Sequence, residues 1–412
     1  MRAGGMRRRR DGTMADGKYR VAYLVTHPIQ YQAPLLRLIA AQSDIDLTVF
    51  FQSDMSLNAY VDRGFGQTVK WDVPLVDGYR HEFLPGIGCH DTVSAQWPIN
   101  WGFRNRLTRE RFDALWVHGY ARWVNWTAML YAKARGLAVL IRDEATLFSA
   151  DRSLVRRQAK RAFFSALSRV GDAFLAIGSA NRDYYLSYGV PKQRIFSMPY
   201  CVDNEFFAKR AEGALESTNR LLSDLQIEAE QPVILYASKF ETRKRPRDLL
   251  LAYEKLVAGW SSTLKPQLLF LGDGELRPTL EADVRGKGLS GVKFLGFRNQ
   301  SELPKFYALC DVFVLPSSAE PWGLVVNEVM ATGKPVVLSD QVGCACDLVR
   351  NGVNGFVFPM GDIDALAGAL RRILCDRDNA ARMGRASREI IAKWCFANDI
   401  EGLRLALRSA VG

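Results

Sequence analysis

The sequence has no long hydrophobic run, and this absence excludes one class of protein at once. None of its apolar stretches approaches the roughly 18 residues that a membrane-spanning helix needs. Its seven cysteines are an odd number spread over 412 residues, so they do not form the framework of a disulfide-rich secreted domain. Cys344 and Cys346 lack a second ligand pair at zinc spacing, and we interpret them as packing or loop residues. These absences favour a reducing compartment, the cytoplasm.

The first 18 residues also lack what a secretory signal requires. They hold six basic and two acidic residues, but no apolar segment follows the arginines. Glycine, arginine and aspartate cannot bury a core, so we expect residues 1–18 to form a disordered basic tail. Met14 is a second candidate for the start of the chain.

What is present is an ordinary globular composition with an uneven charge. Hydrophobic residues make up 48% and charged residues 24%, and the length suggests two or three domains. The formal net charge is +11, yet residues 97–170 alone carry 14 basic and five acidic side chains. Because this segment and the tail hold the whole excess, the positive charge is a local property of the first half.

Short apolar runs alternate with helix-length amphipathic stretches from Arg20 onward. Buried-type apolar runs of this kind predict parallel strands, and the alternation predicts right-handed βαβ crossovers in doubly wound sheets. The expected strands are Val21–Val25, Leu47–Phe51, Ala114–Val117, Leu137–Ile141 and Ala173–Ile177 in the first half, and Val233–Ala237, Leu268–Leu271, Val292–Leu295, Val312–Leu315 and Pro335–Leu338 in the second.

This pattern predicts two α/β domains that face a central cleft. We expect a first domain over residues 19–207, a polar linker over 208–231 and a second domain over 232–390. Residues 391–412 are expected to form a C-terminal helix that can cross back to the first domain. Ligands of such sheets bind beyond the carboxyl ends of the strands, so candidate site residues are sought in the loops that follow them.

The most informative of these loops follows the expected strand Val312–Leu315. Gly323 is expected to open a helix that Gly333 ends, with Glu320 in the loop and Glu328 about a turn and a half inside the helix. The free N–H groups around Gly323 and Leu324 would favour a phosphate. Two carboxylates beside such an anion site can hold two sets of hydroxyls, whereas the alternative is two ordinary surface glutamates.

A basic loop follows the strand Val233–Ala237. It contains Lys239 and Lys244, and a helix is expected to begin near Pro246. A run of charge is often only a solvated surface. At the carboxyl end of a strand, however, the two lysines are placed to neutralise a diphosphate.

Together these residues resemble the family 4 retaining glycosyltransferases of GT-B architecture. The resemblance runs from about residue 19 to the end and is strongest over 232–360. It is carried by Glu320 and Glu328 eight positions apart, Ser238-Lys239-Phe240 with Lys244, Gly272-Asp273-Gly274, Phe294-Leu295-Gly296, Asn351–Gly355, and Pro199–Phe206 near the domain join. Three positions depart from the family pattern: Lys239 replaces an arginine, Arg245 a glycine and Asp347 a glutamate.

The resemblance implies a role for each matching residue on the donor side. Lys239 and Lys244 would bind the donor diphosphate and stabilise the charge that develops on it. Glu320 would hold the donor sugar and Glu328 the ribose, while the backbone at Phe297 and Arg298 would border the nucleobase. It further implies a UDP- or GDP-linked sugar as donor and no cofactor. Transfer would retain the anomeric configuration by front-face attack, so Glu320 is not assigned as a nucleophile.

The first half supplies fewer candidates, all placed after expected strands. His27 and Gln30 lie in the loop after Val21–Val25, and they are expected on the acceptor side of the cleft. His118 follows Ala114–Val117 and matches a family histidine that reaches the donor sugar. Arg142 and Glu144 follow Leu137–Ile141 and are also expected to face the acceptor. A lone histidine with only a structural role is the alternative interpretation of His27.

No metal site is expected. Asp44-Ile45-Asp46 has the Asp-x-Asp form of metal-dependent transferases, but it precedes a strand at its amino end, which is the wrong edge of the sheet. Activity should therefore be independent of added metal and survive EDTA.

The basic segment 97–170 is also rich in tryptophan. It holds five of the nine tryptophans, and residues 152–170 read as an amphipathic helix. Its apolar face is expected to include Val155, Ala159, Ala162, Phe163, Ala166, Leu167 and Val170. Such a helix either packs on the first sheet or rests on an anionic membrane surface, and both can hold at once. A peripheral enzyme at the inner face of the plasma membrane, acting on a lipid-linked acceptor, is the resulting hypothesis.

Two further functions fit parts of the pattern. A nucleotide-sugar epimerase or a soluble glycan synthase would use the same fold. A nucleic-acid-binding protein would use the positive charge, but the sequence contains no recognisable nucleic-acid module and the two glutamates would then have no role. The sequence therefore favours a transferase of cell-surface polysaccharide assembly, with a nucleotide sugar and a glycan or lipid-linked acceptor as partners and no nucleic acid.

Overall fold

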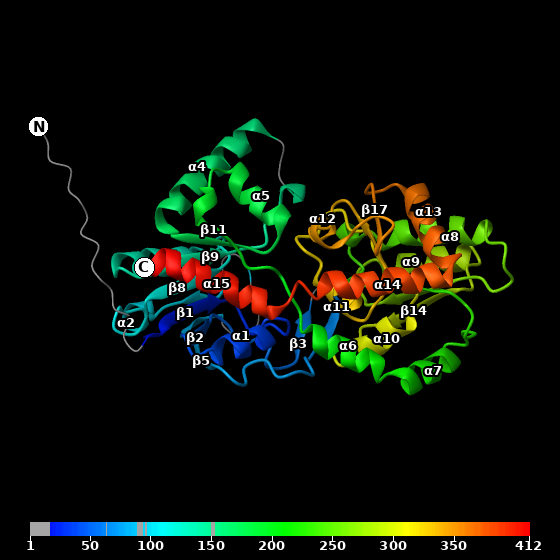
Figure 1. Ribbon diagram of the computed structural model, residues 1–412, viewed down its shortest axis with the longest axis horizontal. Coiled ribbons are helices and arrows are strands. Elements are labelled where there is room, and N and C mark those ends of the chain that lie inside the picture. Colours follow the sequence, from blue (N-terminus) through cyan, green and yellow to red (C-terminus); the bar gives the residue numbers. More distant parts are fainter. Residues whose placement is uncertain (1–16, 63, 89–93, 95–96, 150–152) are drawn as a thin grey trace, which may run out of the picture.

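The computed structural model describes residues 17–412 except 63, 89–93, 95–96 and 150–152. The expected tail thus lies almost wholly outside the described residues. Figure 1 shows two α/β domains side by side along the long axis of the molecule. Each is built on its own parallel sheet, which confirms the predicted fold of two Rossmann-like domains.

The first domain has a seven-stranded sheet in the order β11-β10-β9-β8-β1-β2-β5. Apolar residues on both sheet faces are buried because helices cover both. On one face lie α1 (Ala33–Ala40) and α15 (Phe396–Val411), and on the other α3 (Trp123–Ala134), α4 (Leu154–Val170) and α5 (Ser179–Ser187). The strands are β1 (Tyr19–Val25), β2 (Ile45–Phe51), β5 (Arg80–Phe83), β8 (Ala114–His118), β9 (Ala138–Arg142), β10 (Ala173–Ala176) and β11 (Ile195–Ser197), and α2 (Phe103–Arg106) is a short additional helix.

The second domain has a six-stranded sheet in the order β14-β13-β12-β15-β16-β17. Its strands are β12 (Val233–Ala237), β13 (Gln267–Leu271), β14 (Val292–Gly296), β15 (Val312–Leu315), β16 (Val336–Ser339) and β17 (Gly355–Phe358). One face is covered by α6 (Asn204–Glu212), α10 (Leu303–Leu309) and α11 (Leu324–Ala331), and the other by α8 (Pro246–Ala258), α9 (Arg277–Gly286) and α13 (Ile363–Leu374). The remaining helices are α7 (Leu215–Asp224), α12 (Ala345–Leu348) and α14 (Arg377–Ile391).

All ten expected strands are present, and each begins or ends within two residues of its predicted position. The strands that the sequence did not reveal are short or carry polar residues. They are β5, β11, β17 and two antiparallel pairs, β3 (Tyr60–Asp62) with β4 (Gln67–Val69) and β6 (Gly86–Ile87) with β7 (Ile99–Asn100). None contains the long apolar run from which buried strands were predicted.

Two segments near the domain join are helical. The polar segment 208–231 contains most of α6 and all of α7, and α6 packs against α10 and α11 of the second domain. The last helix, α15, returns to the first domain and packs on β9, β10 and β11 (Figure 1). Gly402 permits the close approach, because a Cβ there would meet the backbone of Ser197.

The helix α4 differs in its buried face from the sequence-based expectation. Phe164 and Leu167 are its buried residues, whereas Val155 is 78% exposed and Ala162 is also exposed. The expected face was wrong because the side of α4 that packs inward passes through Phe164 and Leu167, while Ala166 on the expected face is exposed as well. The first turn presents Leu154 and Val155 to solvent beside Arg157.

Candidate functional site

The candidate residues of both domains lie in loops at the carboxyl ends of the parallel strands. On the second domain, Lys239 follows β12, Gly272 follows β13, Phe297 follows β14 and Glu320 follows β15. On the first domain, His27 follows β1, His118 ends β8 and Glu144 follows β9. Because ligands of doubly wound sheets bind at this edge, the two sets of loops define one candidate active site.

Lys244 and Glu320 form a buried ion pair at the centre of the second domain's loops. The Lys244 Nζ contacts Glu320 Oε2, and both side chains are only 11% exposed. Arg243 Nη1 lies 3.8 Å from the same carboxylate oxygen. Burial lowers the pKa of Lys244, although Glu320 opposes that shift. Because protein already surrounds this ammonium group, it would lose little further water on contact with a diphosphate.

The backbone around this pair explains one departure from the family pattern. Arg245 occupies the left-handed region with φ 50°, where the family has a glycine. Its Nε donates to Asp248 Oδ2 at 2.6 Å in the first turn of α8. This contact offsets part of the cost of a left-handed conformation in a residue with a Cβ.

The Glu320 loop is fixed by its neighbour across the sheet. The Glu320 N–H donates to Gln341 O at 3.1 Å, and its carbonyl accepts from the Gly343 N–H at 2.9 Å. Gly323 then begins α11 with φ 97°, and a Cβ there would lie 3.2 Å from Leu315 Cδ2. The first-turn N–H groups at Leu324 are thereby held at the edge of the sheet that faces the cleft.

Lys239 lies beside the loop after β13, which contains Gly272 and Gly274. The Phe240 N–H donates to Asp273 O at 2.9 Å, which ties the loop after β12 to the loop after β13. Gly272 and Gly274 have φ of 129° and 152°, and a Cβ on Gly272 would meet the Ser238 carbonyl. Both glycines are therefore required for the close approach of these two loops. The Asp273 carboxylate is engaged by Arg277 Nη1 at 2.6 Å.

A cavity of about 170 Å³ lies next to these loops. Four of the predicted donor residues line it, together with a wall of aromatic and apolar side chains. The lining residues are Gln30, Phe65, Trp71, Ala237, Ser238, Leu271, Gly272, Phe297, Arg298, Gln300, Leu303, Tyr307, Val325 and Glu328. Gln30, expected on the acceptor side, thus lies in the same cavity as Glu328.

Glu328 is the ionisable group at the end of this cavity. Tyr307 donates to its Oε2 at 2.6 Å. Burial raises the pKa of Glu328 to about 7, although the Tyr307 hydrogen bond acts in the opposite direction. Near neutral pH this carboxyl is therefore divided between its neutral and its charged form.

The raised pKa predicts a pH dependence of nucleoside binding. Hydroxyls that donate to Glu328 bind its charged form better, so affinity should rise as pH increases through about 7. Between pH 6 and pH 8 the charged fraction changes by roughly tenfold, which sets the expected change in Kd for uridine or guanosine. The Glu328→Gln variant should bind with a Kd independent of pH over this range. An equal slope in both proteins, measured by calorimetry, would exclude Glu328 as the titrating group.

On the first domain, His118 and Glu144 belong to one hydrogen-bond network. His118 Nε2 lies 3.4 Å from Glu144 Oε1, and its Nδ1 lies 3.0 Å from the Tyr23 hydroxyl. Tyr200, near the domain join, donates its hydroxyl to Glu144 Oε1. Burial works against the charged form of Glu144, but hydrogen bonds from His118 and Tyr200 keep its pKa below the ordinary value. This network joins the first domain's candidate residues to the cleft.

Arg142 does not face the cleft, which corrects the sequence-based expectation. Its side chain is 2% exposed, and its Nη2 lies 3.1 Å from Asp399 Oδ1 on α15. The guanidinium also lies over the Tyr200 ring, 4.8 Å from the centroid. Arg142 therefore supports the wall of the site and holds the C-terminal helix, and it cannot contact an acceptor directly.

His27 lies close to the site but carries no charge at neutral pH. Its Nδ1 is 3.0 Å from Thr26 Oγ1. Burial lowers the pKa of His27 to about 4, and Arg122 and His118 act in the same direction. His27 can therefore act as a neutral hydrogen-bonding group, and it cannot serve as a cation for a phosphate.

The comparisons with known proteins agree with this arrangement. Residues 218–390, which include Lys239, Lys244, Glu320 and Glu328, match the family model described as glycosyl transferases group 1. Over these residues the chain is similar to the group 1 glycosyltransferases. This confirms the resemblance to family 4 stated above.

Two curated relatives match part of this chain. It is 32% identical over 170 residues to the sulfoquinovosyl transferase SQD2 of Arabidopsis thaliana, which covers 40% of this chain and 31% of the relative. It is 30% identical over 246 residues to a GDP-mannose-dependent phosphatidylinositol monomannoside mannosyltransferase of Mycobacterium tuberculosis, which covers 56% of this chain and 60% of the relative. The chain thus spans less than two thirds of the length of either relative.

A solved structure matches the fold along almost the whole chain. HepE of Anabaena, in complex with UDP and glucose, superposes with a TM-score of 0.70 at 17% sequence identity. The match covers 95% of this chain and 99% of the other. At this identity the similarity establishes the two-domain fold alone.

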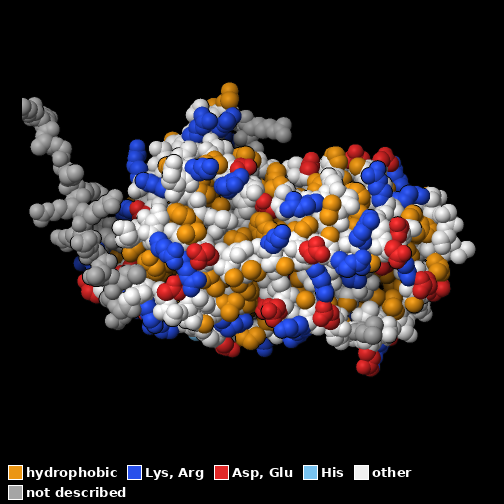
Figure 2. All heavy atoms as spheres, viewed as in Figure 1, with side chains coloured by type: hydrophobic (Ala, Val, Ile, Leu, Met, Phe, Trp, Pro, Cys, Tyr) orange, Lys and Arg blue, Asp and Glu red, His pale blue; other side chains and the backbone are white. Residues whose placement is uncertain are grey.

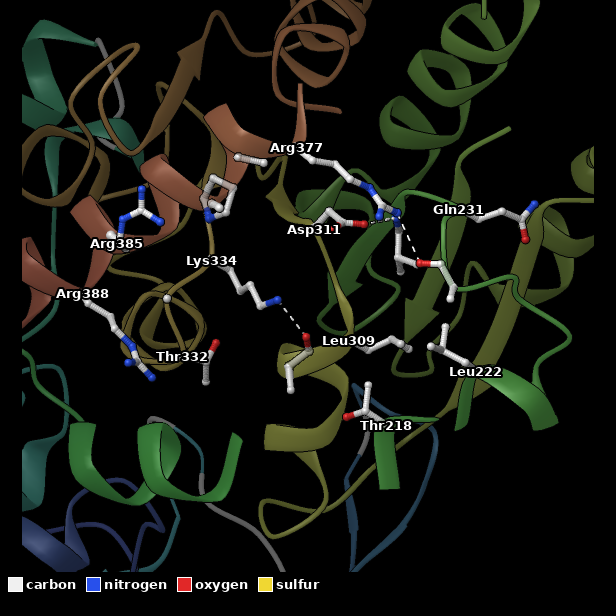
Figure 3. A pocket seen from close by; sticks show the side chains of 17 residues that line it. Thr218, Leu222, Gln231, Leu309, Asp311, Thr332, Lys334, Arg377, Arg385 and Arg388 are labelled. Atoms are coloured by element: carbon white, nitrogen blue, oxygen red, sulfur yellow. Dashed lines mark hydrogen bonds between the residues drawn. The ribbon is translucent and has the colours of Figure 1, made fainter. Parts of the chain in front are cut away.

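Figure 3 shows a larger cavity of about 420 Å³, which none of the candidate site residues lines. It adjoins Val233, Asp311 and Pro335, which stand at the amino ends of β12, β15 and β16. Its cations have partners nearby: Arg377 Nη1 lies 2.5 Å from Glu230, and Lys334 Nζ donates to Ala308 O at 2.7 Å. The loops that carry the candidate residues are at the opposite edge of the sheet, so this cavity is not part of the candidate site.

Neither a metal cluster nor a membrane-spanning helix is found in the part of the chain that the structure describes. Within that part, His, Cys, Asp and Glu side chains nowhere gather in a group of three or more that could ligate an ion. Among the same residues no helix has the length and apolar character to cross a bilayer. Asp44 of the Asp-x-Asp sequence is engaged by Arg404 Nε at 2.8 Å, at the amino end of β2.

Several residues of the candidate site were not predicted from the sequence. Tyr200 and Tyr23 carry no charge at neutral pH and lie in apolar surroundings, so their role as hydrogen-bonding partners of His118 and Glu144 left no signal. Gln300 lines the cavity, and its Oε1 is buried without a partner among the described residues. Gln300 stands three residues after Phe297, so its position in the loop after β14 could have identified it as a candidate.

Proposed function

We propose that this chain transfers a sugar from a nucleotide-sugar donor to a glycan or lipid-linked acceptor, with retention of the anomeric configuration. The observation that carries the proposal is the buried Lys244–Glu320 pair, at a strand end, beside Lys239 and the cavity that holds Glu328. This arrangement supplies cations for a diphosphate, one carboxylate for a sugar and another for a ribose.

The proposed reaction breaks the bond between the sugar C1 and the donor phosphate oxygen. A bond then forms between C1 and the acceptor oxygen, on the same face of the sugar. The proton of the acceptor hydroxyl passes to the departing phosphate oxygen, so charge and atoms balance. Lys239 and Lys244 stabilise the negative charge on that oxygen in the transition state. Glu320 orients the sugar hydroxyls and is not a nucleophile. Neither a metal nor a cofactor takes part, so EDTA should leave turnover unchanged.

The test is a screen of UDP- and GDP-sugars for thermal protection and for acceptor-dependent release of the nucleotide. A ligand at a hundredfold excess over its Kd should stabilise the protein by about 2.7 kcal/mol. Conversion of a nucleotide sugar into its epimer without an acceptor would favour the alternative activity of the same fold. Salt-sensitive binding to duplex DNA without any nucleotide-sugar turnover would instead favour a nucleic-acid-binding protein.

We further propose that the first domain rests on an anionic membrane surface where it meets a lipid-linked acceptor. Leu154 and Val155 are 74% and 78% exposed, and Trp101 and Trp123 are 51% and 45% exposed, within the segment that carries the excess positive charge. Figure 2 shows hydrophobic and basic side chains together over α4, at the top of the first domain. The two relatives named above are, by their names, a sulfoquinovosyl transferase and a phosphatidylinositol monomannoside mannosyltransferase.

Flotation with vesicles tests this attachment. The protein should float with vesicles of 30% anionic lipid and remain unbound with neutral vesicles. A Leu154→Asp/Val155→Asp variant should lose most of this binding while its nucleotide affinity stays unchanged, because α4 does not reach the donor loops. Equal recovery with neutral and anionic vesicles would contradict the electrostatic attachment.

A further inference from the structure

A loop of the first domain reaches across the cleft and contacts the proposed diphosphate lysine. Asp62 ends β3, and its Oδ1 lies 2.8 Å from Lys239 Nζ of the second domain. The Asp62 side chain is 15% exposed and that of Lys239 29% exposed, so water only partly screens the pair. The Asp62 carboxylate thus forms an ion pair with Lys239, the cation that is proposed to bind the donor diphosphate.

The Asp62–Lys239 contact is held by close packing and by backbone hydrogen bonds around it. Gly64 lies against it, since a Cβ at Gly64 would be 2.6 Å from Lys239 Cδ and 2.6 Å from Glu241 Oε1. A Cβ on Gly274 would lie 3.0 Å from the Gly64 carbonyl. The same Asp62 oxygen accepts from the Gly64 N–H at 2.8 Å and from the Phe65 N–H at 3.1 Å. Asp62 is therefore oriented toward Lys239 by its own backbone.

The following residues continue the contact along the wall of the donor cavity. Phe65 packs edge-on against Phe297 with ring centroids 4.8 Å apart, and Trp71 lies 6.4 Å from the same ring. Asn299 Nδ2 donates to Lys70 O at 2.5 Å, and the Ser301 N–H donates to Asp72 Oδ2 at 3.3 Å. The first domain thus closes the base end of the cavity while Asp62 closes its phosphate end.

We propose that Asp62 is a positioning residue that competes with the donor diphosphate for Lys239. In the empty enzyme Asp62 holds the ammonium group in place and keeps the two domains together. A diphosphate brings more negative charge to the same cation, and two anions side by side repel each other. Lys239 therefore exchanges Asp62 for the diphosphate when the donor binds. The first domain then loses this contact with the second domain. This inference rests on the proposed function.

The Asp62→Asn variant separates competition from a structural role. An asparagine keeps a side-chain oxygen for the Gly64 and Phe65 N–H groups and removes only the charge. Relative to wild type, this variant should bind UDP or GDP, whichever the protein prefers, about five- to twentyfold more tightly. Uridine or guanosine, which lack phosphates, should bind with an unchanged Kd. Asp62→Glu should restore the diphosphate Kd toward that of wild type.

Asp72→Asn is the matched control. Asp72 also joins the two domains, through Ser301, but it does not contact Lys239. This variant should change the affinities for diphosphate and nucleoside by the same factor. Calorimetry on the full chain measures the Kd for the diphosphate and the Kd for the nucleoside in wild type and in each variant.

The outcomes separate the two proposals. If wild type binds neither UDP nor GDP, the proposed function fails and Asp62 has no donor to compete with. If wild type binds a diphosphate but Asp62→Asn weakens that binding, or shifts the nucleoside equally, the competition is wrong and the proposed function stands.

Discussion

Replacing Lys244 with methionine should reduce sugar transfer by at least a hundredfold in kcat. Lys244 Nζ contacts the buried Glu320 carboxylate, and the proposed reaction places negative charge on the leaving phosphate next to this cation. Removal of a preorganised charge from a site with little water typically costs two to three orders of magnitude in rate. Glu320→Gln should have an effect of similar size, since it releases both Lys244 and the donor sugar.

The double variant distinguishes a joint role from two separate ones. If the pair acts as a unit, Lys244→Met/Glu320→Gln should be little slower than either single variant. Lys255→Met is the matched control, because Lys255 lies on α8 and pairs with the exposed Asp364 at 2.6 Å. Its activity should stay within twofold of wild type. Full activity in Lys244→Met, with a normal melting temperature, would refute the site assignment.

Replacing Arg142 with methionine should have the largest effect on stability. The Arg142–Asp399 pair is almost fully buried, with exposures of 2% and 1%. Breaking such a pair from one side leaves an uncompensated buried charge and typically costs about 3–5 kcal/mol. Burial raises the pKa of Asp399 to about 6, and Arg142 opposes that shift. Without Arg142 the Asp399 carboxyl can bind a proton at pH 5 and become neutral, but it stays charged more often at pH 8. The loss in free energy of unfolding should therefore be larger at pH 8 than at pH 5.

Urea unfolding at the two pH values measures this effect. Asp399→Asn in the Arg142→Met background should recover part of the loss at pH 8, because it removes the buried charge. Arg404→Met serves as the control, since Arg404 joins the same helix to Asp44 through a partly exposed pair. It should cost less than about 1 kcal/mol. A loss of that small size for Arg142→Met would show that the buried pair contributes no more than a surface pair.

The fold was predictable because its signals are local. Runs such as Val233–Ala237 and Val312–Leu315 are apolar on both faces, and only a parallel sheet covered on both sides buries them. The Gly323 start of α11 was equally clear, since a glycine after a strand suits the left-handed residue that the structure has there. The donor side of the site followed from these elements, because Lys239, Glu320 and Phe297 stand directly after strands.

What the sequence did not reveal depends on contacts between distant residues. Asp62 and Lys239 are 177 residues apart, and nothing near Asp62 indicates a partner in the other domain. Arg142 was expected in the cleft because it follows a strand, yet Asp399, 257 residues later, draws it into the core. The face of α4 was misjudged because Val155 fits the helical period of an apolar stripe, yet it is exposed, and the side of the helix with Phe164 and Leu167 is buried instead. Periodicity reports the pattern of one element and not which of its sides a neighbour covers.

The return of α15 to the first sheet has a consequence for synthesis of the chain. Ile400, Leu403 and Leu407 pack in the same core as Val21 and Leu47, so one side of the first domain is built from residues at both ends of the sequence. While the ribosome is still translating the second domain, that side of the sheet lacks its cover. The domain made first is therefore the one completed last, and a nascent chain that stops short of Phe396 leaves an apolar surface for chaperones to bind.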